Sequence, residues 1–420
     1  MARLRRLGVV KGTRHLRPVN RSSPSESVAP GRQQAARTVP DGEPQALPAL
    51  LPGLELVATP EGACYVLDRV YPLQFRHGAA ALDSLLQHRP AAAAPFCGEP
   101  RLRDLDFRDF LFVDTETTGL HGAGTLAFMV GVAFYEDDAF VSRQYFLRDH
   151  GDEPAMLWLL DQLLAERPAL ITFNGRSFDL PLLDGRFLLN RMPSDLLQRP
   201  HIDLLLPARR LWRQRLDSCA LSALEQALLG LQRSQEDVPG WLIPSLYNDY
   251  LASGDGREMA RVFYHNRIDL LSMVTLAARI VRQLAAPQPG DHPIDLFGLG
   301  RWLATLGRTA AAEEVLRLAA VPELPTPLYQ QALAHLALLL KRAGRRDEAI
   351  TVWQQLASTS FDDVTAHIEL AKHYEWHGRD LETACFWTEQ AIALLGPHDR
   401  TLHAELVHRH RRLIRKMGRD

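Results

Sequence analysis

Cysteine is scarce in this sequence of 420 residues. The four cysteines lie far apart and form neither a C-x-x-C motif nor the spacing of a zinc finger: Cys64, Cys97, Cys219 and Cys385. This usage is typical of buried free thiols in a reducing compartment and does not fit a disulfide-stabilised secreted domain. We therefore expect a cytoplasmic protein.

The sequence also lacks any apolar run that approaches the length of a membrane span. After Val10 the N-terminal segment is too polar to hold the apolar core of a secretory signal. Neither charge sign is in clear excess, because the formal net charge is -2. We expect no membrane contact, and any nucleic-acid site must be a local patch.

Apolar residues, in contrast, are plentiful: the chain is 46% hydrophobic, enough for two or three domains. Residues 1–50 are expected to form a disordered basic tail, since the first 47 residues carry nine Lys or Arg and three acids. Such a tail could contact RNA or DNA phosphates, act as a targeting segment, or simply be solvated. We assign it no role.

Residues 51–105 are predicted to form a small N-terminal cap and linker, because alternating apolar residues flank the turn Thr59–Gly62 as in a hairpin. Residues 106–286 then alternate strands and helices, which is an α/β pattern. The expected elements are a strand from residue 111, antiparallel strands over 126–134 and 140–147, a strand over 169–173, and helices over 79–87, 156–165, 208–216 and 270–284.

Two acids end the strand that begins at Leu111. Asp114 and Glu116 are two residues apart, so in a strand both project to the same face. Like charges at that spacing repel, and a divalent cation with a preference for oxygen ligands, Mg²⁺ or Mn²⁺, would relieve the repulsion. The alternative is a solvated strand end.

Two further motifs place acids near strand ends or on a helix. The run Phe173–Pro181 ends a buried strand at Asn174-Gly175 and starts a helix, which puts Asp179 where open α/β sheets bind ligands. Farther on, His265 and Asp269 are four residues apart and share one helical face. A histidine on such a face is most often structural unless other functional groups lie beside it.

The four acids Asp114, Glu116, Asp179 and Asp269 occur in an order that resembles the DEDD exonucleases. More closely, the motifs D-T-E-T-T-G, F-N-G-x-x-F-D-x-P, H-x-D-L, A-R-R-L-W-R, L-x-S-C-x-L, D-V-P-G-x-x-I-P and H-N-x-x-D-x-x-S resemble the YprB family of ribonuclease-H-like proteins, over about residues 54–284. The resemblance implies an α/β ribonuclease-H-like domain, with a mixed sheet flanked by helices, whose four acids bind two divalent cations, Mg²⁺ or Mn²⁺.

The implied activity is hydrolysis of RNA or DNA phosphodiester bonds, as a 3′ to 5′ exonuclease with single-stranded nucleic acid as its partner.

Proofreading-type relatives place a Tyr four residues, or a His five residues, before the last acid. Here His265 is four and Tyr264 five residues before Asp269. We favour His265 as the general base, because a neutral imidazole can accept a proton from metal-bound water. Asp203 matches an acidic position whose role the resemblance does not fix.

Four residues are predicted to bind substrate. Asn174 and Thr117 lie beside the acids in sequence, whereas Arg209 and Arg213 belong to a predicted helix that also carries Arg210 and Arg215. These arginines could contact phosphates. They could equally form a solvated helix face.

Residues 292–420 are rich in Ala, Leu and Arg, and a Gly-Arg pair recurs at residues 307, 344 and 378. The intervals resemble tetratricopeptide repeats, which predicts an all-α array of three helix pairs with a possible protein partner. A last helix would either cap the array or present a basic nucleic-acid patch. A second reading of the whole chain is therefore a nucleic-acid-binding or scaffold protein with a non-catalytic ribonuclease-H-like domain and partner-binding repeats.

Overall fold

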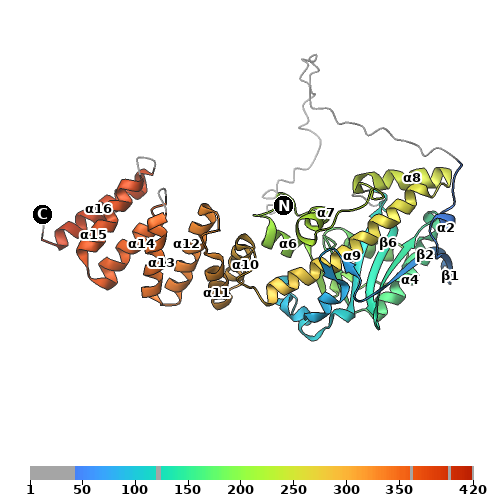
Figure 1. The fold of residues 1–420 in the computed structure, drawn as a ribbon, viewed down its shortest axis with the longest axis horizontal. Helices are drawn as coiled ribbons and strands as arrows, with labels where there is room; N and C mark the ends of the chain where they lie inside the picture. Colours follow the sequence, from blue (N-terminus) through green and yellow to red (C-terminus); the bar gives the residue numbers. More distant parts are fainter. Residues whose placement is uncertain (1–42, 120–123, 360–362, 396–398, 419–420) are drawn as a thin grey trace, which may run out of the picture. The chain divides into compact units, whose positions relative to one another are not determined.

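A computed structural model describes residues 43–119, 124–359, 363–395 and 399–418. Most of the expected basic tail therefore lies outside the described residues. Seven strands form one mixed sheet in the order β1-β2-β7-β6-β5-β8-β9, with helices packed against it (Figure 1). The strands are β1 (Leu54–Thr59), β2 (Gly62–Pro72), β5 (Phe110–Thr117), β6 (Ala127–Glu136), β7 (Ala139–Phe146), β8 (Ala169–Thr172) and β9 (His201–Asp203). A two-stranded sheet contains β3 (Arg76–His77) and β4 (Ala80–Ala81).

The sheet is antiparallel from β1 to β5, while β8 and β9 continue it in parallel with β5. The expected antiparallel pair β6 and β7 is confirmed. The expected hairpin is also present as β1 and β2, but the expectation that it forms a separate cap is wrong. Its second strand pairs with β7 from Tyr65 to Pro72 and so extends the central sheet.

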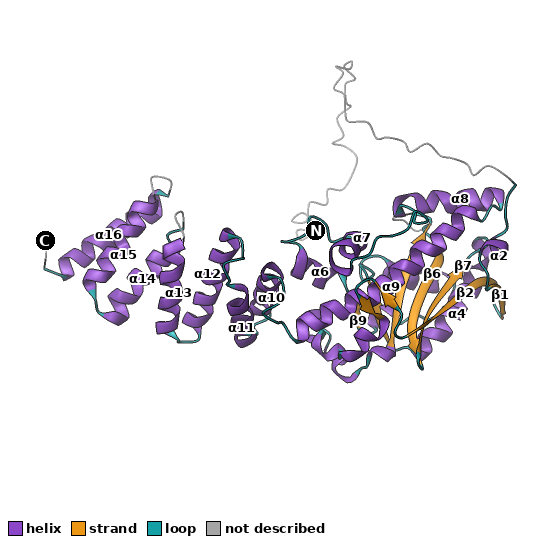
Figure 2. Cartoon of the chain, in the orientation of Figure 1, coloured by secondary structure: helices purple, strands orange, loops and turns teal. Residues whose placement is uncertain are grey.

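Helices surround this sheet, as the cartoon shows (Figure 2). Those of the α/β region are α2 (Leu47–Leu50), α3 (Ala94–Cys97), α4 (Glu153–Glu166), α5 (Asp179–Leu189), α6 (Leu205–Trp212), α7 (Leu221–Leu224), α8 (Ile243–Ser253) and α9 (Arg257–Ala285). The longest of these, α9, contacts β5, β6 and β7. It begins 13 residues before the predicted start at residue 270, so the His265 and Asp269 motif lies within the helix.

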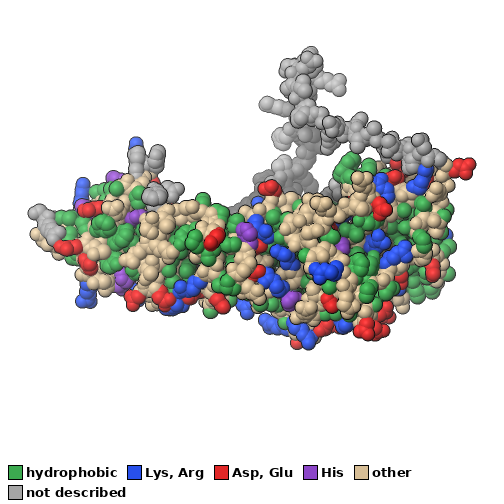
Figure 3. Space-filling model, viewed as in Figure 1, with side chains coloured by type: hydrophobic (Ala, Val, Ile, Leu, Met, Phe, Trp, Pro, Cys, Tyr) green, Lys and Arg blue, Asp and Glu red, His purple; other side chains and the backbone are tan. Residues whose placement is uncertain are grey.

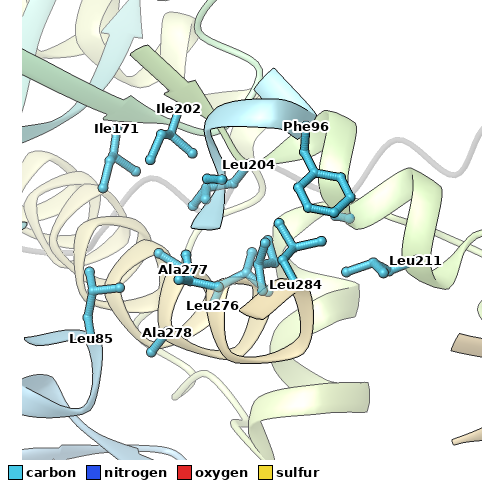
Figure 4. Packing of buried hydrophobic residues seen from close by; sticks show 14 of the residues in the cluster. Leu85, Phe96, Ile171, Ile202, Leu204, Leu211, Leu276, Ala277, Ala278 and Leu284 are labelled. Atoms are coloured by element: carbon cyan, nitrogen blue, oxygen red, sulfur yellow. The ribbon is translucent and has the colours of Figure 1, made fainter. Parts of the chain in front are cut away.

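Alternate residues of β5 pack into two hydrophobic clusters. Phe110 and Phe112 belong to one cluster, and Leu111 and Val113 belong to the other. A strand buried on both faces needs such a continuous apolar run. In the first cluster, Leu276 and Leu284 of α9 lie beside side chains from β8, β9 and α6 (Figure 4). Asp114 and Glu116 continue the alternation set by Phe110 and Phe112.

Two predicted helices differ from the structure. The stretch 79–87 includes β4 and the 3₁₀ helix Leu82–Gln87, because Ala80 and Ala81 pair with β3. The helix predicted over 208–216 ends at Trp212. Beyond it, Arg215 turns to a buried ion pair with Asp295, with nitrogen–oxygen distances of 2.7 and 2.9 Å.

The C-terminal region is all helical, as expected. Its helices are α10 (Pro293–Thr305), α11 (Thr309–Ala319), α12 (Thr326–Arg342), α13 (Arg346–Thr359), α14 (Thr365–His373), α15 (Leu381–Leu395) and α16 (Arg400–Lys416). The recurring Gly-Arg pairs mark turns with left-handed backbone, at Gly307 (φ 72°) and Gly344 (φ 78°). At the third turn Arg379 has the positive φ, 53°, after the π-helical segment Tyr374–Gly378. Assignment to the tetratricopeptide class stays a prediction.

Helix α10 is joined to the α/β region by close packing. The first hydrophobic cluster continues from α9 into α10, α11 and α12. Phe96 and Trp302 meet edge to face at 4.7 Å, and Gly298 lets α10 approach the carbonyl of Arg210 so closely that a Cβ there would lie 2.7 Å from it. The domain division at residues 286 and 292 stays a prediction.

None of the helices in the described ranges is long and apolar enough to cross a membrane. Acidic and basic side chains are interspersed over the face seen in Figure 3. This mixture agrees with the near-zero net charge.

Candidate active site

Asp114 and Glu116 lie near the end of β5, just before the chain leaves the sheet. Asp114 is opposite Gly131 of β6, and the register shifts between Glu116 and Thr117. Glu116 is only 9% exposed, and no described residue donates a hydrogen bond to it. Thr117 donates its hydroxyl to the carbonyl of Gly119 at 2.8 Å, which ties the strand end into the following turn. Its contact with substrate stays a prediction.

Asp179 begins α5 and reaches back to β5. Its Oδ1 accepts hydrogen bonds from the backbone nitrogen of Thr115 at 3.1 Å and from the Thr115 hydroxyl at 2.5 Å. Thr115 thus lies between the two acids of β5 in sequence and holds the third. Since Asp179 is buried, this pairing fixes which way its carboxylate faces.

Asp203 holds the loop between β8 and α5, which leads to Asp179. Its carboxylate accepts from the backbone nitrogens of Asn174 (2.8 Å), Leu205 (3.0 Å) and Arg176 (3.1 Å). Asn174 has a left-handed backbone with φ 69°, a conformation that asparagine tolerates better than most residues. The acid whose role the sequence left open is therefore a structural tie between β9 and this loop.

Asp269 lies on α9 inside a network of ion pairs. Arg233 donates to its Oδ1, and the same guanidinium makes two hydrogen bonds of 2.7 Å to Glu225. His265 Nε2 lies 3.6 Å from Asp269 Oδ2, and His265 Nδ1 lies 2.7 Å from Asp237 Oδ1. Arg233 Nη1 also lies 3.2 Å from His265 Nδ1 and would need a lone pair there. The contact to Asp237 is the shorter one and favours a proton on Nδ1, which leaves the Nε2 lone pair on the side of Asp269.

Asn266 connects Asp114 to the next strands. Its Nδ2 donates to Asp114 Oδ2 at 2.8 Å, and its Oδ1 accepts from Gln144 Nε2 at 2.9 Å. Asp114, Gly131 and Gln144 are consecutive partners across β5, β6 and β7, so Asn266 of α9 spans this row. A Cβ on Gly131 would lie 2.0 Å from Asn266 Oδ1. Glycine is therefore needed for α9 to sit this close to the sheet.

The four acids influence one another's charge. Burial and then the neighbouring acids raise the pKa values of Asp114 and Glu116 well above their usual range. Burial also raises the pKa of Asp179 to about 6, against hydrogen bonds from Thr115 that lower it. For Asp269 burial raises the pKa, while His265 and Arg233 lower it. The structure thus brings all four acids close enough to repel.

The donor set fits hard divalent cations. The hydrogen bonds that other described residues donate fall on one oxygen of each aspartate: Asp114 Oδ2, Asp179 Oδ1 and Asp269 Oδ1. The second oxygens and Glu116 are available for ligation. No three of the four carboxylates have oxygens that all lie within 4.8 Å of one another. The four acids are therefore not gathered around the position of a single ion.

Two of the predicted substrate-binding residues lie together, whereas a third lies apart from them. Asn174 and Arg209 line one cavity of about 170 Å³ with Cys97 and His201. Arg213 is exposed at the end of α6, and no described contact brings it to that cavity. Tyr264 accepts a hydrogen bond from the Ser234 backbone nitrogen at 3.3 Å, and its ring faces Arg267.

Sequence reasoning missed four residues that support the acids: Asn266, Gln144, Arg233 and Asp237. Asn266 and Asp237 stand inside motifs that carried the family resemblance, which was the available signal. Nothing in the sequence singles out Gln144 or Arg233. Their roles depend on strand register and on the path of the loop between α7 and α8.

We expect Gly131→Ala to lower the free energy of unfolding by about 1 to 3 kcal/mol, as overpacking does, because the new methyl group would collide with Asn266. Chemical denaturation measures the loss. Gly185→Ala is the matched control, since a Cβ there meets nothing within 4 Å. Combining Gly131→Ala with Asn266→Ala should cost less than the sum of the two. Strict additivity would contradict the proposed contact.

The raised pKa values predict how the metal-free protein responds to pH. Between the unfolded pKa near 4 and the folded pKa of about 6 for Asp179, the folded state binds more protons, so stability falls as pH rises through this window and beyond it for the other acids. In EDTA, Asp114→Asn should flatten this fall in thermal melts. The exposed change Glu166→Gln should leave it as in wild type, and equal slopes in all three proteins would refute the coupling.

Comparison with known proteins agrees with this geometry. Residues 111–281, which contain all four acids, match the family model of the RNase H superfamily. The chain is also 29% identical over 350 residues, or 79% of its own length and 80% of the relative, to the uncharacterized protein YprB of Bacillus subtilis (strain 168). The resemblance seen in the motifs is confirmed. Residues 111–281 form a domain of the RNase H superfamily, in a chain that is similar to YprB along most of its length.

Proposed function

We propose that this chain is a metal-dependent nuclease that hydrolyses phosphodiester bonds of RNA or DNA, as a 3′ to 5′ exonuclease acting on single strands. The superfamily match supports a nuclease-type function. The observation that carries the proposal is the arrangement of the aspartates. In each, the scaffold holds one oxygen by hydrogen bonds and leaves the other for a cation.

Asp114, Glu116, Asp179 and Asp269 would hold two divalent cations, Mg²⁺ or Mn²⁺. When bound, the ions supply an activated water and stabilise the leaving oxygen of the phosphodiester. The chain's own residues orient the ligands: Thr115 for Asp179, Asn266 for Asp114 and Arg233 for Asp269. These supports limit the reorganisation needed when substrate arrives.

His265 is the better candidate for the general base. Asp237 accepts from Nδ1, so Nε2 can take a proton beside Asp269. The Tyr264 hydroxyl is already engaged by the Ser234 backbone. Arg209 and Asn174 line a cavity in which a substrate phosphate could bind, and Arg213 lies at the end of the same helix.

The rival function is a nucleic-acid-binding or scaffold protein with a non-catalytic ribonuclease-H-like domain. The Arg233 ion pair with Asp269 favours this rival to a degree, since a guanidinium already neutralises one acid. The C-terminal helices could recruit a protein partner under either proposal. A cytoplasmic location stays part of the proposal.

Wild-type protein should shorten end-labelled single-stranded RNA or DNA with Mn²⁺ or Mg²⁺ and not with EDTA. A 5′ label should give a ladder of shortened strands, and a 3′ label should appear at once as mononucleotide. Asp114→Asn should abolish cleavage, because a charged ligand is lost, whereas Glu166→Gln should not change it. Binding without cleavage under every metal condition would favour the rival.

His265→Ala should lower the cleavage rate by about 10² to 10⁴, the usual contribution of a general base. Tyr264→Phe should cost much less, and metal-induced thermal stabilisation should be nearly unchanged in both. Rates at saturating Mn²⁺ separate loss of the base from loss of metal. A damaging Tyr264→Phe with a mild His265→Ala would reverse the assignment.

A further inference from the structure

Three side chains of different chemistry meet on the last two helices. Cys385 and Glu389 are one turn apart on α15, and His410 comes from α16. Glu389 Oε1 accepts from the Cys385 thiol at 3.5 Å and is 2.9 Å from His410 Nε2. The three ligand atoms all lie within 4.8 Å of one another, the only such set of three or more among the described residues.

The spacing of these atoms is close to that around a tetrahedral zinc ion. With Zn–S near 2.3 Å and Zn–O near 2.0 Å, sulfur and oxygen ligands stand roughly 3.5 Å apart, and nitrogen and oxygen ligands about 3.3 Å apart. The observed distances are 3.5 and 2.9 Å. Both distances from Glu389 Oε1 are thus within about 0.4 Å of the zinc values, and the third pair, Cys385 Sγ and His410 Nε2, lies within 4.8 Å.

We propose that Cys385, Glu389 and His410 bind a zinc ion, with a water molecule in the fourth position. Thiolate and imidazole ligands select zinc over Mg²⁺ and Ca²⁺, which take oxygen ligands. Cys385 is buried, whereas the side chains of Glu389 and His410 are 54% and 29% exposed, so the ion can enter from solvent. This site is separate from the four acids and does not depend on the proposed nuclease function.

Zinc binding would displace the thiol proton of Cys385 to solvent and any proton on His410 Nε2 to Nδ1 or to solvent, and both of these groups face Glu389 Oε1. In the metal-free protein this oxygen accepts from the thiol and lies within hydrogen-bond distance of the imidazole. Binding requires the thiolate and a neutral imidazole, so affinity should rise with pH as protons are released.

The structural effect of zinc would be to fix α16 on α15. Of the described residues of α16, two hydrophobic ones are buried, Leu406 and Leu413. Ion pairs to the buried Glu375 add to this contact, from Arg409, Arg412 and Lys416. A helix held by so few apolar contacts gains much from an added tie. Since zinc binds only the folded site, it should raise the unfolding temperature of this end of the chain.

Cobalt(II) is the probe, added to the full-length protein freed of metal. A thiolate bound to cobalt gives a charge-transfer band in the near ultraviolet, to which the four acids of the other site cannot contribute. We expect the band in wild type and its loss when zinc is added. Cys385→Ser should abolish it, and the matched change Cys219→Ser at a cysteine outside the site should leave it unchanged.

His410→Gln tests the site without touching the buried cysteine. It should weaken cobalt binding by at least about 100-fold, since even changes beside a metal ligand cost about 10- to 100-fold. Zinc should raise the melting temperature of wild type by more than that of His410→Gln, because any zinc held by the four acids stabilises both proteins alike. Circular dichroism confirms that each variant is folded. No thiolate band in wild type, or a band that persists in a folded Cys385→Ser protein, would overturn the proposal.

Discussion

Asp114, Glu116, Asp179 and Asp269 repel one another while burial disfavours their charged forms, and this repulsion is what the surrounding structure has to balance. The fold provides fixed hydrogen-bond donors from Thr115, Asn266 and Arg233, spread over β5, α9 and the loop before α8. The donors satisfy one oxygen of each aspartate only. The remaining negative charge is what a divalent cation would neutralise.

The position of α9 follows from the same constraint. Asn266 must cross from the helix to Asp114, and it does so over Gly131, with Gln144 holding its other end. Because Gly131 of β6 has no side chain, α9 can lie this close to the sheet. Because His265 and Asp269 are on this helix, the distance between helix and sheet also places the proposed base and the fourth acid. Packing and chemistry are coupled through a single glycine.

Local sequence patterns determined much of the fold. The apolar run before Asp114, the pair β6 and β7, most of α4 and the second half of α9 could be predicted because period-two and helical patterns are local. The ordered acidic motifs were enough to predict the superfamily. The helical C-terminal region could also be predicted from the sequence, since its Gly-Arg turns recur at regular intervals.

Tertiary structure alone decided what depends on partners distant in sequence. It joined the hairpin at β2 to the central sheet, turned Arg215 toward Asp295, and gave Asp203 a structural role. It also brought Cys385 beside His410, although the cysteine spacing shows no metal motif. Sequence determines which residues can form a strand, a helix or a ligand. Which of them meet depends on strand register and helix packing, which arise only when the whole chain minimises its free energy.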